Sequence, residues 1–120
     1  MATILIVDDI PSETALMTKV VQDMGHTAYA VADGESALDA AAKIQPALVL
    51  LDVVMPKQDG FKTCRFLKKN PETSPIPVVM VTSKDGESDQ FWAERQGANG
   101  YVIKPFNPGS LAGVIRKFVA

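Results

Sequence analysis

Four short apolar runs divide the chain, and each is followed directly by a polar or charged residue. The runs are Ile4–Val7, Ala47–Leu51, Val78–Val81 and Tyr101–Ile103. The first three runs are typical of strands that are covered on both faces of a sheet, and Tyr101–Ile103 predicts a further short strand. A fifth segment, 26–32, alternates alanine with Tyr29 and Val31 and is less apolar, which predicts a strand at the sheet edge.

Helical periodicity fills the segments between these strands. In the clearest case, Leu111, Val114, Ile115, Phe118 and Val119 fall at spacings i, i+3, i+4, i+7 and i+8. Four other helices are expected between Pro11 and Gly25 (with Leu16, Val20 and Met24 on its apolar face), between Gly34 and Pro46, from Phe61 to Asn70, and over 88–96. Strands that alternate with helices form a parallel sheet through right-handed crossovers. The pattern therefore predicts one doubly wound α/β domain.

Composition and charge limit the partners and the cellular compartment expected for this domain. A chain of 120 residues with 47% hydrophobic residues can bury one core. The net charge of −2 argues against direct nucleic-acid binding. The apolar runs are far shorter than the ~20 residues of a membrane helix, and the N-terminus lacks the basic leader of a signal peptide. Cys64, the single cysteine, is expected to be a small buried hydrophobe. We therefore expect a cytoplasmic protein without membrane insertion.

The residues that terminate the strands carry the candidate chemistry. They are Asp8 and Asp9 after the first strand, Asp52 after the third, Thr82 and Ser83 after the fourth, and Lys104 after the fifth. Ligands of open α/β sheets bind outside the carboxyl ends of the strands, where three carboxylates, two hydroxyls and one ammonium would meet.

Neighbouring carboxylates require raised pKa values or a cation, and Mg²⁺ suits oxygen ligands and bridges to phosphoryl groups. A carboxylate can be the nucleophile of phosphoryl transfer, with Lys104 and Thr82 neutralising and hydrogen-bonding the group that is transferred. Each residue also has a simpler explanation: a helix cap for Asp8 or Asp9, a turn for Asp52, a solvated surface position for Lys104. Tyr101 is equally a packing residue, and His26 is expected on the surface with no ligand role.

The chain resembles the receiver domain of two-component response regulators, the CheY-like family, over essentially its whole length. The matching segments are ILIVDD (4–9), LLDVVMPKQDG (50–60), VMVTS (79–83), GA (97–98) and GYVIKPF (100–106). The resemblance implies one receiver domain over 1–120, with a flavodoxin-like, five-stranded parallel sheet of order 2-1-3-4-5 and five helices. Phe91–Trp92 and RQGA (95–98) are similar to PilH-like receivers of pilus-linked twitching or phototaxis pathways, which implies control of motility or taxis.

The resemblance also implies a phosphoacceptor site. Asp52 would accept a phosphoryl group from the phosphohistidine of a histidine kinase. Asp9 and Asp52 would bind Mg²⁺ directly (Mn²⁺ could substitute), with Asp8 acting chiefly through water and the backbone carbonyl of Val54 as a further ligand. The protein would be a signalling protein that catalyses only its own phosphorylation and dephosphorylation.

The remaining implied roles concern the switch. Lys104, joined to Pro105 by a cis peptide bond, would pair with the phosphoryl oxygens, while Thr82 would move toward them and Ser83 would leave them room. Tyr101 would swing inward as Thr82 moves. Asp59–Gly60 would close the loop after Asp52, where Gly60 would adopt a backbone conformation that other residues resist.

The output is expected to be a contact with a downstream protein target, because no effector domain follows Ala120. We expect this contact at the face formed by the fourth helix, the fifth strand and the fifth helix, including Phe91, Trp92 and Tyr101.

Two positions depart from well-known single-domain members of the family: Val54 offers no polar group to an attacking water, and Lys84 is a cation where an acid can stand. Val54 therefore predicts that self-dephosphorylation depends on geometry alone or on a separate phosphatase.

Two other protein classes use similar parts. A haloacid-dehalogenase-type, Mg²⁺-dependent phosphohydrolase also has an aspartate nucleophile at a strand end, but it needs a second acid where Val54 stands. A flavodoxin-like electron carrier would need a hydroxyl-rich phosphate loop where this chain has Asp8 and Asp9. Turnover of phosphomonoesters or a yellow protein would identify these alternatives.

Overall fold

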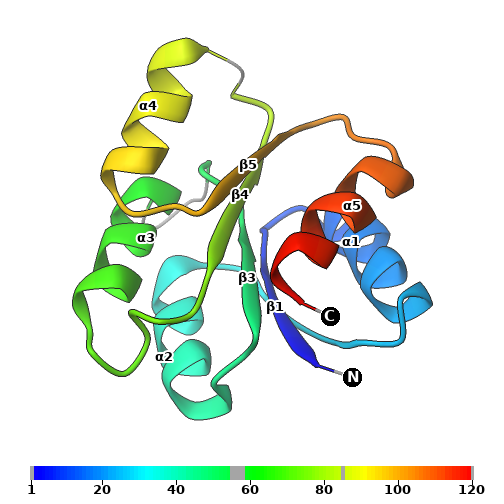
Figure 1. Ribbon diagram of the computed structural model, residues 1–120, viewed down its shortest axis with the longest axis horizontal. Helices are drawn as coiled ribbons and strands as arrows, with labels where there is room; N and C mark the ends of the chain where they lie inside the picture. Colours follow the sequence, from blue (N-terminus) through cyan, green and yellow to red (C-terminus); the bar gives the residue numbers. More distant parts are fainter. Residues whose placement is uncertain (1, 55–58, 85, 120) are drawn as a thin grey trace.

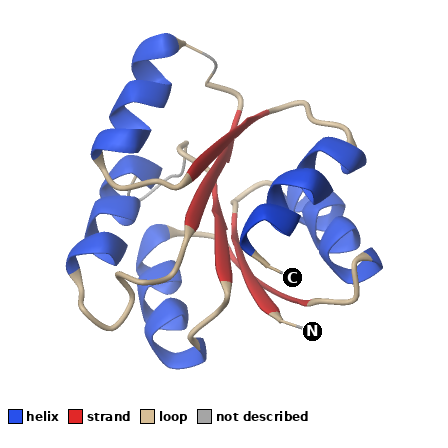
Figure 2. Ribbon diagram, viewed as in Figure 1, coloured by secondary structure: helices blue, strands red, loops and turns tan. Residues whose placement is uncertain are grey.

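Five strands alternate with five helices in the computed structural model, which describes residues 2–54, 59–84 and 86–119. The strands are β1 Thr3–Val7, β2 Thr27–Val31, β3 Leu48–Leu51, β4 Val78–Thr82 and β5 Gly100–Ile103. The helices are α1 Pro11–Asp23, α2 Gly34–Ile44, α3 Gly60–Lys69, α4 Glu87–Arg95 and α5 Pro108–Phe118. Figures 1 and 2 show the strands as a central twisted sheet between two groups of helices.

All neighbouring strands of the sheet are parallel, and their order is β2-β1-β3-β4-β5. Both the order and the edge position of β2 confirm the predictions. The chain runs outward from β1 to β2 and then crosses to β3 on the other side of β1. This reversal places the carboxyl ends of β1 and β3 side by side, with Val7 paired to Leu51, and such a switch point is where doubly wound sheets bind ligands.

Helices cover both faces of the sheet, which explains the continuous apolar runs of the strands. Helices α2, α3 and α4 cover one face, where Ala37, Leu67 and Ala93 pack against the side chains of the strands. Helices α1 and α5 cover the other face through Met17, Val21, Leu111 and Ile115. No helix in the described ranges combines the length and the apolar character needed to cross a bilayer.

Side-chain caps and left-handed residues set the helix ends. Asp33, Asp59 and Asn107 each accept a hydrogen bond from a backbone N–H three residues later. Gly25 and Gly97 follow α1 and α4 with φ of +87° and +97°, a conformation that glycine adopts without strain. The element boundaries agree with the sequence prediction to within two residues, except that α5 begins at Pro108, three residues before Leu111, the first residue of its predicted apolar pattern.

Three expectations about single residues were wrong. Leu16 is 42% exposed, and Met17 takes the buried place on α1. His26 is only 9% exposed, and its Nδ1 accepts a hydrogen bond from the backbone N–H of Ala2, which ties the start of β1 to the start of β2. Gly60 does not have a positive φ; instead, a Cβ there would lie 2.2 Å from the carbonyl oxygen of Asp52, so glycine is needed for space.

Candidate functional site

The sheet ladder continues one residue beyond several strands and brings the predicted polar residues to one edge. The backbone N–H of Asp8 donates to the carbonyl of Val31, and that of Asp52 donates to the carbonyl of Val7. The N–H of Lys104 donates to the carbonyl of Thr82 in the same way. These bonds place the three residues at the carboxyl ends of β1, β3 and β5, along one edge of the sheet, as expected from the ends of the apolar runs.

Lys104 is the centre of a cluster of three carboxylates. Its Nζ lies 2.6 Å from Oδ2 of Asp8 and 3.5 Å from Oδ2 of Asp52, and it also contacts Oε2 of Glu13. The side chains of Asp8, Asp52 and Lys104 are almost completely buried. The structure thus brings Lys104 and Asp52 within reach of each other, a condition on which the predicted site depends.

The environment of Asp52 opposes its negative charge. Burial raises the pKa of this carboxyl, and the negative charge of Asp8 raises it further. The Lys104 ammonium and hydrogen bonds from the Val54 N–H and from Thr82 lower the pKa, but the net shift is upward. A buried carboxylate that is only partly compensated is poised to interact with an additional cation.

Lys104 shows the opposite balance. Burial lowers the pKa of its ammonium, but hydrogen bonds to Asp8 and Glu13 and the charges of Asp52 and Asp8 together outweigh the effect of burial, so that the pKa is raised. The ammonium is therefore held in its charged form, in which it can pair with anionic oxygens.

The cluster has the donor set of a site for a hard divalent cation. Carboxylate oxygens of Asp8, Glu13 and Asp52 all lie within 4.8 Å of one another. One ammonium against three carboxylates leaves an excess of two negative charges in this group of four side chains, the charge that one Mg²⁺ would balance. Asp9 is exposed, and it lines the adjacent pocket of about 340 Å³ together with Val54 and Ser83.

Sequence reasoning missed Glu13. It belongs to the first turn of α1, which begins at Pro11, and its side chain points back to the strand ends. The distance of four residues from Asp9 and the proline at the first helical position indicate where the helix starts, but the rotation of the helix about the sheet, which decides where Glu13 points, depends on packing.

Other predicted residues lie around this cluster. Thr82 is buried, and its Oγ1 accepts a hydrogen bond from the Lys84 N–H at 3.4 Å. Ser83 is exposed and lines the pocket, and the Lys104–Pro105 peptide bond is cis. The Val54 N–H donates to Oδ1 of Asp52 at 3.3 Å. Of the matched segment 50–60, residues 55–58 lie outside the described residues.

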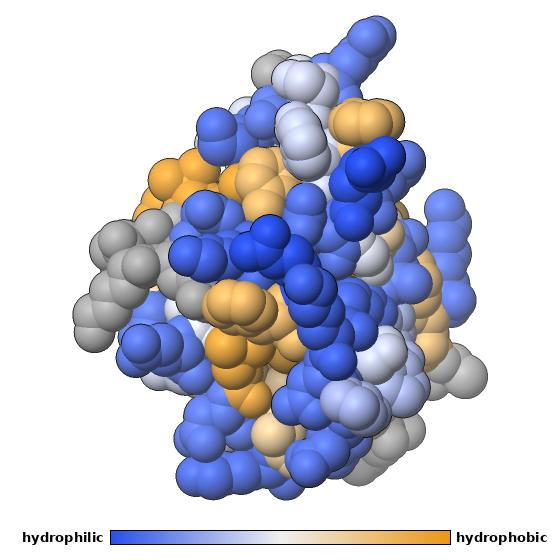
Figure 3. Space-filling view, turned by 90° about the vertical axis from the view of Figure 1, so that its left-hand side faces the viewer, coloured by the Kyte–Doolittle hydropathy of each residue, from blue (hydrophilic) through white to orange (hydrophobic). Residues whose placement is uncertain are grey.

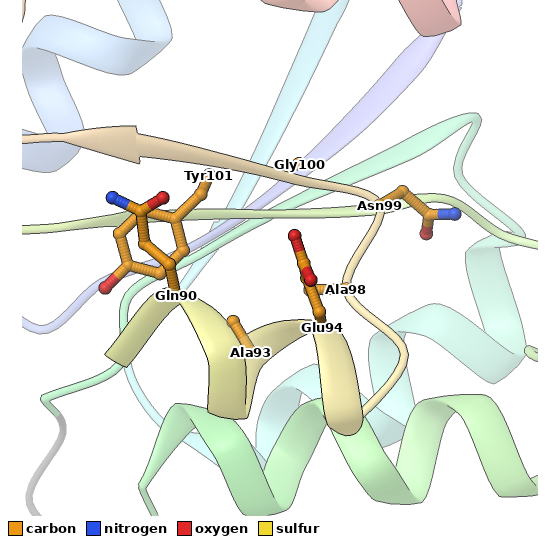
Figure 4. Close-up of a pocket in the computed structure, with 7 residues that line it drawn as sticks. All are labelled: Gln90, Ala93, Glu94, Ala98, Asn99, Gly100 and Tyr101. Atoms are coloured by element: carbon orange, nitrogen blue, oxygen red, sulfur yellow. The ribbon is translucent and has the colours of Figure 1, made fainter. Parts of the chain in front are cut away.

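A second, smaller pocket lies between α4 and β5. Tyr101 and Gly100 of β5 and Gln90, Ala93 and Glu94 of α4 line it, together with Ala98 and Asn99 (Figure 4). The hydroxyl of Tyr101 donates to the carbonyl of Lys84 at 2.6 Å. The backbone of Lys84 therefore connects Thr82 to Tyr101.

Helix α4 presents two large apolar side chains to solvent. Phe91 and Trp92 are 53% and 52% exposed, and their rings meet edge to face with centroids 5.9 Å apart. Figure 3 shows the side of the molecule that carries α3 and α4, where hydrophobic surface occurs in separate areas between polar residues.

Comparisons with known proteins agree on the family. The model of the response regulator receiver domain matches residues 4–116. Protein PilH of Pseudomonas aeruginosa is 42% identical over 120 residues, which cover 100% of this chain and 99% of PilH. The DNA-binding response regulator MtrA of Mycolicibacterium smegmatis is 38% identical over 113 residues, covering 94% of this chain and 48% of MtrA, so the chain spans about half of that relative.

Solved structures show the same similarity. Chemotaxis protein CheY4 of Vibrio cholerae superposes with a TM-score of 0.93 at 29% identity and 99% coverage of both chains. The BeF3-activated N-terminal receiver domain of Klebsiella pneumoniae RstA superposes with a TM-score of 0.89 at 28% identity and 97% coverage of both chains. The family match, the sequence relatives and the fold all agree with the acidic cluster at the strand ends. The chain therefore belongs to the response regulator receiver domains of two-component signalling.

Proposed function

We propose that the protein accepts a phosphoryl group on Asp52 from a histidine kinase in a Mg²⁺-dependent reaction. The observation that carries this proposal is the geometry of Asp52, a buried carboxylate at a strand end with the Lys104 ammonium 3.5 Å away and a pocket beside it. The pocket, at about 340 Å³, has room for a phosphoryl group and several waters, each of which takes about 30 Å³ in the liquid.

In the transfer, a carboxylate oxygen of Asp52 attacks phosphorus and forms a P–O bond. The P–N bond to the kinase imidazole breaks, and the leaving nitrogen keeps the electron pair. Lys104 supplies positive charge to the phosphoryl oxygens, and the Thr82 hydroxyl supplies a hydrogen bond. Asp8, Asp9, Asp52 and the Val54 carbonyl would hold Mg²⁺, which neutralises charge on the phosphoryl oxygens when it is bound.

We further propose that phosphorylation changes binding of a downstream protein at the face formed by α4, β5 and α5. Phe91 and Trp92 offer exposed aromatic surface there, and Tyr101 is joined through Lys84 to Thr82. Aromatic residues are enriched at the centres of protein interfaces. The similarity to PilH supports an output in motility or taxis.

The proposal is tested by incubating the protein with acetyl phosphate and Mg²⁺ and measuring its intact mass. We expect one phosphoryl group per chain, stable in acid and labile in base, that is absent with EDTA and absent from Asp52→Asn. Continuous release of inorganic phosphate from phosphomonoesters, without a stoichiometric adduct, would instead indicate the phosphohydrolase alternative.

A further inference from the structure

The contact between Glu13 and Lys104 has no place among the roles implied by the family resemblance. The Lys104 ammonium contacts Asp8 and Glu13 more closely than Asp52, the residue whose phosphoryl group it is expected to bind. We propose, on the basis of the function proposed above, that Glu13 is a positioning residue that holds the Lys104 ammonium in the unphosphorylated protein and competes for it with the phosphoryl group on Asp52.

The start of α1 orients Glu13 toward the cluster. Ile10, in an extended conformation, precedes the helix, and its backbone N–H donates to Oδ1 of Asp8 at 2.9 Å. The N–H of Glu13 in turn donates to the carbonyl of Ile10 at 3.1 Å. These bonds hold the first turn of α1 against Asp8, the aspartate that binds Lys104. The Glu13 side chain, which extends from this turn, therefore contacts the Lys104 ammonium.

The contacts of Lys104 differ in how strongly water screens them. The side chain of Asp8 is 0% exposed and that of Asp52 is 5% exposed, whereas that of Glu13 is 34% exposed and is among the residues that line the pocket. Water can solvate a released Glu13 carboxylate but cannot easily solvate Asp8. The Glu13 contact is therefore the one that Lys104 exchanges most readily for phosphoryl oxygens that enter the pocket.

A purely structural role would have a different signature. An acid in the first turn of a helix also interacts favourably with the helix dipole, without any contact to Lys104. Glu35 occupies the first turn of α2, is exposed, and makes no ion pair or hydrogen bond with the cluster among the described residues. Glu35→Gln is therefore the matched control for Glu13→Gln.

The first measurement uses the full chain without metal or anion. The ¹H–¹³C signal of the Lys104 Cε methylene, assigned by its loss in Lys104→Met, reports on the surroundings of the ammonium. We expect Glu13→Gln to move this signal and Glu35→Gln to leave it in place. An unmoved signal in Glu13→Gln would overturn the proposal.

The second measurement titrates beryllofluoride, a stable phosphoryl mimic, at saturating Mg²⁺ and follows the amide spectrum. We expect half-saturation of Glu13→Gln at a roughly two- to fivefold lower concentration than for the wild type, since a partly exposed ion pair no longer competes. Unchanged or weaker binding would contradict the proposal, as would stronger binding with an unmoved Lys104 signal, which would indicate a general charge effect. If Asp52→Asn bound beryllofluoride as tightly as the wild type does, the proposed function would be refuted. The first measurement would still test the Glu13–Lys104 pair in that case.

Discussion

Asp52 carries its charge in a place that disfavours it. The side chain is almost fully buried, and burial together with the negative charge of Asp8 raises its pKa by more than Lys104 and two hydrogen bonds lower it. The folded protein therefore binds a proton at Asp52 more tightly than the unfolded chain does. A residue with this balance reduces the stability of the fold once it ionises, which is a cost that functional sites commonly carry.

Asp52→Asn is expected to raise the free energy of unfolding, and to do so in a pH-dependent way. Well below the ordinary Asp value of 3.8, Asp52 is protonated in both states and the gain is small. As the pH rises from there through the raised pKa of Asp52 in the folded protein, ionisation of Asp52 lowers the free energy of unfolding of the wild type. The variant lacks this contribution, so the difference between the two proteins grows. Urea unfolding across this range measures the difference, and a gain that is independent of pH would contradict the assignment.

Val54 is expected to slow the loss of the phosphoryl group. Its side chain is exposed at the pocket and offers no hydrogen bond to an attacking water. Val54→Asn should shorten the phosphoryl half-life about two- to tenfold, the value of one hydrogen bond. The half-life is read from the decay of the intact mass in the absence of phosphodonor. Val54→Leu should leave it unchanged, and an unchanged half-life in Val54→Asn would refute the explanation.

The strand-end residues were predictable because an apolar run that stops on a polar residue marks both the strand and the sheet edge. Asp8, Asp52, Thr82 and Lys104 all lie at that edge. Glu13 was not found, because the rotation of its helix about the sheet depends on packing that the sequence does not display. His26 was wrongly expected at the surface for a similar reason, since its partner is the backbone of Ala2, 24 positions earlier.

At the scale of elements, two glycines at helical positions have opposite consequences. A Cβ at Gly60, the first residue of α3, would lie 2.2 Å from the Asp52 carbonyl oxygen and 2.6 Å from Cα of Val53. At Gly113, within α5, a Cβ would have no heavy atom of the described residues within 4 Å beyond its chain neighbours and the backbone of its own helix. The first glycine allows α3 to start directly beside Asp52, whereas the second only weakens its helix.

Alanine at these positions should therefore change stability in opposite directions. Gly113→Ala is expected to raise the free energy of unfolding by about 0.5–1 kcal/mol, the usual gain of alanine over glycine within a helix. Gly60→Ala is expected to lower it by roughly 1–3 kcal/mol because backbone must move. Urea unfolding measures both, and equal effects of the same sign would be inconsistent with this account.

The elements themselves followed closely from hydrophobic periodicity. The sheet interior, the edge strand β2 and all five helices were expected, since strands covered on both faces are continuously apolar. The strand order came from the family resemblance, because periodicity alone does not order parallel strands. The exposed Leu16 shows the limit of apolar spacing: Met17 fits the same helical pattern and takes the buried place.

Across the whole molecule, a short covalent and hydrogen-bonded path joins the site to the α4–β5 surface. Lys84 donates its N–H to the Thr82 hydroxyl and accepts a hydrogen bond from the Tyr101 hydroxyl through its carbonyl. A shift of Thr82 would therefore disturb the bond that holds Tyr101. Two-state coupling of this kind is typically worth ~1–3 kcal/mol.

Thr82→Ala is expected to interrupt this coupling. With Mg²⁺ and beryllofluoride, the wild type should show amide shifts near Asp52 and also at Lys84 and Tyr101. In Thr82→Ala the shifts near Asp52 should remain and those at Tyr101 should shrink, while Thr82→Ser should restore them. Undiminished Tyr101 shifts in Thr82→Ala would exclude this route.

The central claim is that Asp52 itself becomes the acyl phosphate, and the position of the modification tests it most directly. Protein phosphorylated by acetyl phosphate is reduced with borohydride, which converts an aspartyl phosphate to homoserine, and the peptides are sequenced by mass spectrometry. We predict homoserine at position 52 and unmodified aspartate at positions 8 and 9. Homoserine at either of those positions, or none anywhere in a protein that has gained the phosphoryl mass, would contradict the account.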